Sequence, residues 1–148
     1  MYKYVGLAGL CASLAINAYR TLKLLRLSIV VGGDSYEPLC GLSRELRFIA
    51  GNNILKELEL FLVIRDPIWD YESPLESKDC SAFDLVLTES GAFPMLHRVS
   101  VDIYWRPAPN DVSYLDAMLE SLKKDNFPRL VKSKAVKFDF CSLFRVRR

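Results

Sequence analysis

Few residues in this 148-residue chain could carry acid–base or nucleophilic chemistry. His97 is the one histidine, and it stands in the segment PMLHRV without a GxSxG motif or a signature cysteine context in the chain. A Ser–His or Cys–His pair needs a nucleophile and an orienting group beside the imidazole. We therefore expect His97 to be a surface side chain, and the sequence predicts no catalytic residue and no enzyme.

Metal and cofactor chemistry is equally unsupported by the spacing of ligand-type residues. The four cysteines are far apart, so no CxxC pair exists, and we interpret Cys11, Cys40, Cys80 and Cys141 as reduced core residues. The acidic segment 66–79 does not match the ligand spacing of a calcium loop, which makes a solvated loop the preferred interpretation. Trp69 and Tyr71 in this segment are either interaction anchors or packed side chains. The phosphate-loop, dinucleotide and zinc-protease motifs are missing, so we expect no cofactor and no metal.

Composition excludes several classes of partner. The chain is 51% hydrophobic and carries a formal charge of +2, which is typical of an ordered globular protein and gives no electrostatic reason to bind nucleic acid or a membrane. The apolar stretch 5–15 is too short to span a bilayer. It is either part of a packed helix over 2–17 or a signal peptide cleaved near Ala15. We expect a cytoplasmic or nuclear protein, with a small secreted protein as the alternative.

The clearest pattern in the sequence is a repeat. The spacing Leu-x-x-Leu-x-Leu-x-Leu, with large aliphatic residues allowed, occurs in LKLLRLSI, LKELELFL and LHRVSVDI. An imperfect fourth copy has Val136, Phe138 and Phe140. The first leucines of the four copies are Leu22, Leu55, Leu96 and Leu130, spaced by 33, 41 and 34 residues. A period of this length indicates a repeat architecture.

Each copy predicts a turn that enters a short strand. The alternating residues face a common core, and the first leucine points into the same core from the turn. We expect strands near residues 22–31, 55–64, 96–105 and 136–141, pairing in parallel. The fold class is α/β: a short leucine-rich-repeat-like solenoid with parallel strands on one face and helices on the other, forming a single repeat domain of about 3.5 units over residues 1–148.

The segments between these strands have the marks of helices. Pro38 suits a first helical turn and Gly51 a helix C-terminus, around a leucine stripe that includes Leu42 and Leu46. Ser81-x-x-Asp84 and Ser113-x-x-Asp116 resemble capping boxes that open the next helices. FPML at 93–96 and FPRL at 127–130 are expected to close those helices and enter the following strands.

Leucine-x-x-leucine-x-leucine units joined by helices resemble the leucine-rich repeat family, over about residues 19–140. The units here are longer than usual, and the customary asparagine or cysteine after the strand is missing. The combination LKELEL, FPMLHRVSVDIYW and YLDAMLESLKKDNFPRL is similar to the C-terminal repeat region of fungal F-box-like proteins. That resemblance implies a substrate receptor for ubiquitin ligation. The repeat pattern starts by about residue 20, so we expect that the sequence contains no F-box segment. A truncated or degenerate fragment without independent function is the alternative.

We expect any binding surface to consist of the strand residues that the repeat directs away from the core. Their mixed charge and aromatic content suit a protein partner better than a phosphate backbone. The same face could equally be an ordinary solvent-facing sheet, and the sequence indicates no oligomeric state. Arg26, Ser28, Lys137 and Asp139 lie on this expected face, and the candidate partner-binding residues are Glu57, Glu59, Phe61, Arg98, Ser100, Asp102 and Tyr104.

Overall fold

Strands and helices alternate along the chain, as the repeat predicts. The computed structural model describes residues 21–31, 38–65, 77–106 and 113–143. In chain order the elements are β1 (Leu24–Val31), α2 (Pro38–Ile49), β2 (Glu57–Arg65), α3 (Ser77–Thr88), β3 (Arg98–Arg106), α4 (Ser113–Asn126), α5 (Pro128–Lys132) and β4 (Lys137–Leu143).

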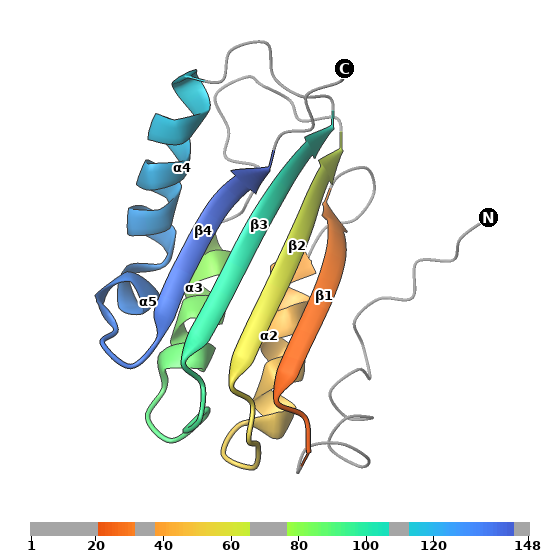
Figure 1. The fold of residues 1–148 in the computed structure, drawn as a ribbon, viewed down its shortest axis with the longest axis vertical. Coiled ribbons are helices and arrows are strands. Elements are labelled where there is room, and N and C mark those ends of the chain that lie inside the picture. The colour runs from red at the N-terminus through yellow and green to blue at the C-terminus, as the bar shows by residue number, and fades with distance from the viewer. Residues whose placement is uncertain (1–20, 32–37, 66–76, 107–112, 144–148) are drawn as a thin grey trace, which may run out of the picture.

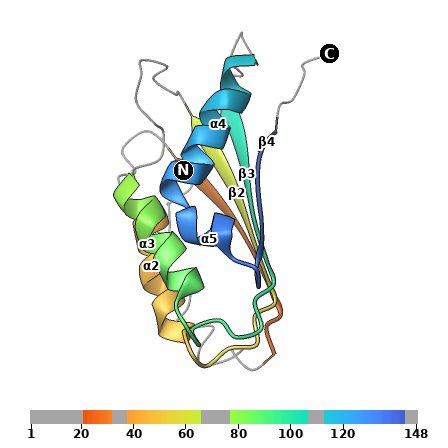
Figure 2. The ribbon, with the colours of Figure 1, turned by 90° about the vertical axis from the view of Figure 1, so that its left-hand side faces the viewer.

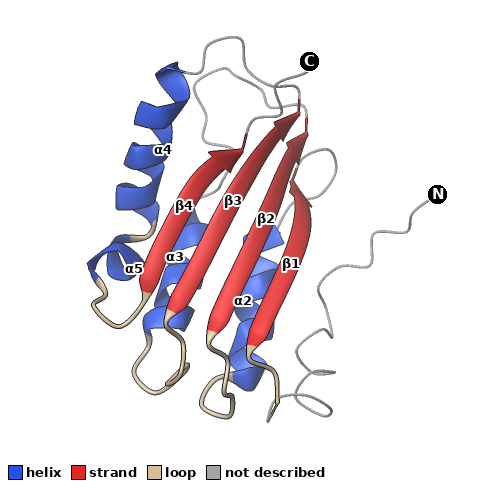
Figure 3. Cartoon of the chain, viewed as in Figure 1, coloured by secondary structure: helices blue, strands red, loops and turns tan. Residues whose placement is uncertain are grey.

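The four strands form one sheet in the order β1-β2-β3-β4, and every neighbouring pair is parallel. The α/β class and the parallel pairing are thereby confirmed (Figures 1 and 3). Each of the four strands begins within two residues of its predicted start. The first three predicted strands start two residues too early, at Leu22, Leu55 and Leu96. These leucines lie in the turns that precede the strands, where the repeat spacing places them.

The register places equivalent positions of the repeat side by side. Leu25 pairs with Leu58, Leu58 with Val99, and Val99 with Phe138. The next inward positions, Leu27, Leu60, Val101 and Phe140, are aligned in the same way. Alternation along a strand sends every second side chain to one face, so in-register pairing collects the apolar side chains of all four strands on that face.

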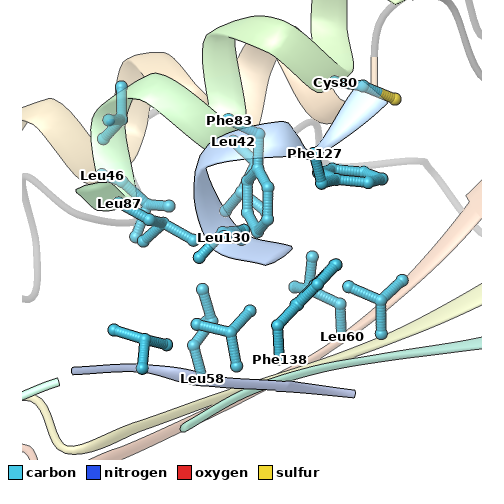
Figure 4. Packing of buried hydrophobic residues seen from close by; sticks show 14 of the residues in the cluster. Leu42, Leu46, Leu58, Leu60, Cys80, Phe83, Leu87, Phe127, Leu130 and Phe138 are labelled. Carbon is cyan, nitrogen blue, oxygen red and sulfur yellow. The ribbon is translucent and has the colours of Figure 1, made fainter. Parts of the chain in front are cut away.

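Helices cover this apolar face. Figure 2 shows the helices on one side of the sheet, and the other side carries no helix of the described chain. Leu42 and Leu46 of α2 and Phe83 of α3 are fully buried and belong to the same hydrophobic cluster as the strand residues. Figure 4 shows these side chains directed from the helices toward Leu58 and Leu60 of the sheet.

The turns before β2 and β3 are joined by a buried asparagine. The Nδ2 of Asn53 donates to the carbonyl oxygens of Ile49, at 2.7 Å, and Ala92, at 2.8 Å, while its Oδ1 accepts from the backbone N–H of Leu55. Gly51, at φ 82°, ends α2 in the left-handed conformation that favours glycine, as predicted, and its N–H also donates to Ala92. Two successive units are thus linked through their turns.

Two local predictions were wrong at the third and fourth units. Helix α3 begins at Ser77, so Ser81 lies inside the helix and does not cap it. FPRL does not lead directly into a strand either, because residues 128–132 form the short helix α5 and β4 starts at Lys137. Proline favours the first position of a helix, and Pro128 is the first residue of α5. Leu130 lies in α5 and is buried. This inserted turn of helix explains the six-residue spacing of the fourth copy.

Candidate functional site

The candidate site is the face of the sheet that points away from the helices. We call it the outer face and define it by the side chains of the alternate strand positions: Leu24, Arg26, Ser28, Glu57, Glu59, Phe61, Val63, Arg98, Ser100, Asp102, Tyr104, Lys137, Asp139 and Cys141. All seven candidate partner-binding residues lie on it. In Figure 1 the viewer looks onto this face, with α2 and α3 behind the strands.

The register arranges these side chains in rows across the strands. From the start of the strands toward their ends, the first four rows of described side chains are Leu24, Glu57, Arg98 and Lys137; then Arg26, Glu59, Ser100 and Asp139; then Ser28, Phe61, Asp102 and Cys141; and then Val63 and Tyr104. The register of β2 and β3 continues with Arg65 opposite Arg106. The first two rows hold three cations and three acids. Asp102 is the one charged side chain described in the third and fourth rows.

Two ion pairs connect neighbouring strands in the charged rows. Arg26 Nε lies 2.6 Å from Glu59 Oε2, and Arg98 Nε lies 3.5 Å from Asp139 Oδ2. The hydrogen bond from Arg26 to Glu59 raises the pKa of Arg26, and the negative charge of Glu59 adds to this effect. The Arg26 side chain is 70% exposed, so water screens the first pair. Exposed pairs of this kind contribute little to folding stability.

Phe61 on β2 and Tyr104 on β3 form a ring pair across the two central strands. Their ring centroids are 6.1 Å apart and the ring planes differ by 24°, which is a stacked arrangement. Both residues are half-buried. Aromatic rings with one exposed side supply a large contact area at small cost in conformational entropy, which is why they are common anchors in protein interfaces.

Asp102 lies in register with Phe61, two residues before Tyr104 on β3. Burial raises the pKa of Asp102, the carboxylate of Glu59 raises it further, and Arg98 lowers it. Asp139 also raises it. The carboxylate is therefore partly desolvated and surrounded by more negative than positive charge.

One candidate residue is placed differently from the prediction. Ser100 was expected to be an accessible partner-binding residue, but it is only 7% exposed. It stands between Glu59 and Asp139 in its row, and both of these side chains are longer than that of serine. Ser100 therefore spaces the charged side chains and offers little surface of its own.

Alternation also identifies three outer-face residues that the prediction omits. Leu24 precedes Arg26 by two positions and is exposed. Val63 follows Phe61 by two positions and is half-buried in register with Tyr104. Cys141 follows Asp139 by two positions and is exposed. The expectation that all four cysteines are core residues is therefore wrong for Cys141, whereas Cys80 on α3 is buried as predicted.

The structure also shows where several other residues that could carry chemistry lie. His97 is exposed in the turn before β3, as predicted. Within residues 21–31, 38–65, 77–106 and 113–143, no three histidine, cysteine or acidic side chains are close enough to hold a metal ion. The predicted helix 2–17, the cleavage position at Ala15, Cys11, Trp69 and Tyr71 lie outside the described residues, as does the side chain of Cys40.

No protein-family model, no curated protein and no solved structure matches this chain. Among the helices of the described ranges, none has the length and apolar character needed to cross a membrane.

Proposed function

We propose that this chain is a non-enzymatic protein-recognition module of the leucine-rich-repeat type, which binds a protein partner through its outer face. The observation that carries the proposal is the gathering of an aromatic pair, two exposed ion pairs and Asp102 on one helix-free sheet face. An aromatic anchor within a polar surround is the usual composition of a protein–protein interface.

The order of the elements supports the repeat assignment within this proposal. Strands that follow one another along the chain are neighbours in the sheet, and the helices between them return on one side. The bond from Asn53 to Ala92 joins equivalent turns. Stacked repeated units produce this arrangement, and a short solenoid presents its sheet as a continuous binding surface.

Charge supports a protein partner over nucleic acid. The described side chains of the outer face include three cations and four acids, so this part of the face gives a phosphate backbone no net attraction. The resemblance to fungal F-box-like proteins supports a more specific role as part of a ubiquitin-ligase substrate receptor, in the cytoplasm or nucleus.

Site-directed photo-crosslinking tests the proposal in cells that express this chain, because it captures proteins bound at a chosen position. A photoreactive phenylalanine analogue would replace Phe61 on the outer face or, as the matched control, Phe48, which is 60% exposed on α2. We expect position 61 to capture specific proteins that position 48 does not, and Glu59→Arg together with Arg98→Glu to reduce that capture severalfold. Equal capture at both positions, or none at 61, would refute recognition through this face.

For the ubiquitin role, the ubiquitination of each captured protein would be compared before and after depletion of this chain. A fall in ubiquitination on depletion is expected of a substrate receptor. Unchanged ubiquitination would leave a recognition module that has no part in ubiquitin ligation.

A further inference from the structure

The outer face divides into two chemically different halves. Its first two rows hold six charged side chains, four of which are satisfied in the pairs Arg26–Glu59 and Arg98–Asp139. Its third and fourth rows hold Ser28, Phe61, Asp102, Cys141, Val63 and Tyr104 in the described chain. Among these six side chains Asp102 carries the single charge, and the next charged positions along β2 and β3 are Arg65 and Arg106.

Asp102 has no ion-pair partner among the described residues. Arg98, the nearest guanidinium along its own strand, is directed to Asp139 on β4, and Arg26 is hydrogen-bonded to Glu59. The carboxylates of Glu59 and Asp139 repel the charge of Asp102, in addition to the effect of its partial burial. Covering this half of the face with an uncharged surface would bury a carboxylate without compensation, which is unfavourable.

The two rings lie next to this carboxylate. Phe61 is the register partner of Asp102 on β2, about 5 Å away across the strands, and Tyr104 is two residues further on the same face, about 7 Å along β3. The pair is stacked with its centroids 6.1 Å apart. A planar cation at this place can therefore meet the carboxylate and a ring face at the same time.

We propose that the protein partner presents an arginine to this half of the outer face, with its guanidinium bound to the Asp102 carboxylate and lying against the Phe61–Tyr104 rings. This inference rests on the proposed function and specifies the chemistry of the partner. Arginine fits better than lysine because its guanidinium is planar, weakly hydrated and able to stack on aromatic rings while it donates hydrogen bonds to a carboxylate.

The test uses a defined probe and does not depend on identifying the partner. The blocked tripeptide Ac-Ala-Arg-Ala-NH₂ would be titrated into the ¹⁵N-labelled chain, with Ac-Ala-citrulline-Ala-NH₂ as the uncharged probe of nearly the same shape. We expect the arginine probe to shift the amide signals of Phe61, Asp102 and Tyr104 about threefold more than the citrulline probe does, since only arginine adds charge to the stacking contact.

Three variants make the outcome specific. Asp102→Asn is expected to remove the difference between the probes and Phe61→Leu to reduce it, whereas Asp125→Asn, at an exposed aspartate of α4, should preserve it. The amide spectrum itself reports whether each variant is folded. Equal shifts from the two probes, shifts elsewhere on the chain, or no shifts would overturn the arginine assignment.

Failure of this inference is distinguishable from failure of the proposed function. If position 61 captures specific proteins while the arginine probe gives no localised shifts, the outer face recognises a partner of another chemistry. If the probe binds at Asp102 but cross-linking captures no protein, the arginine site stands and protein recognition in the cell is refuted.

Discussion

At the scale of single residues, Asp84 shows how one buried side chain joins distant segments. It is 2% exposed on α3, and its carboxylate accepts hydrogen bonds from the backbone N–H groups of Arg129, at 3.0 Å, and Leu130, at 2.8 Å. Asp84→Ala would leave both donors unsatisfied, at a cost of about 2–4 kcal/mol in the free energy of unfolding. Denaturant titration measures this loss, and Asp125→Ala serves as the exposed control. Equal stability of the two variants would contradict the structural role of Asp84.

The same carboxylate predicts a pH dependence of folding. Burial raises the pKa of Asp84 above its ordinary value of 3.8, although the hydrogen bonds from Leu130 and Arg129 lower it. Because the native state then holds the proton more tightly than the unfolded state, the contribution of Asp84 to stability falls as the pH rises through the interval between the two values. The stability of the wild type minus that of Asp84→Asn should therefore decrease from acid toward neutral pH. A difference that increases over that interval would show that the hydrogen bonds outweigh burial.

At the scale of elements, the attachment of α5 and β4 depends on Phe127. Its ring packs edge-on against Phe83 of α3, with centroids 6.1 Å apart, and lies 5.3 Å from Phe138 and 5.6 Å from Phe140 of β4. Figure 4 shows it between the helix layer and the sheet. Phe127→Ala should lower the free energy of unfolding by about 3–5 kcal/mol. Removal of the ring would leave a cavity that the surrounding helices and strand cannot easily fill. Phe48→Ala, at a side chain 60% exposed, is the control and should change stability by about 0.5 kcal/mol or less. Similar losses for the two variants would mean that Phe127 does not hold these elements together.

At the scale of the whole molecule, one hydrophobic cluster includes residues of all four strands and of every helix from α2 to α5. Hydrogen bonds also connect separate segments: Asn53 joins the turns before β2 and β3 through Ala92, and Asp84 joins helix α3 to helix α5. We therefore expect a single cooperative unfolding transition. Native-state hydrogen exchange measures this: the slowest amides of β2 and β3 should report the same free energy of opening. Different values would show that the units unfold separately, as weakly coupled repeats do.

The sequence alone determined the class of the fold and the direction of the strand side chains. Alternation in segments such as LKELEL and LHRVSVDI identifies strands and their two faces, because the side-chain period of an extended chain is two residues. Hence the sequence by itself places Glu59, Phe61 and Asp102 on the outer face. Leu55 and Leu96 were likewise assigned correctly to turns, because the repeat spacing separates them from the alternating residues.

Only the tertiary structure decided which of these side chains meet. The pairing of Arg26 with Glu59, of Arg98 with Asp139 and of Phe61 with Tyr104 follows from the register of neighbouring strands, and local periodicity carries no information about register. The burial of Ser100 has the same origin. Asp84 binds backbone groups 45 and 46 residues away, so its local spacing suggested a cap for the wrong helix. Contacts between residues far apart in the chain depend on how the strands and helices pack against one another, which no local pattern specifies.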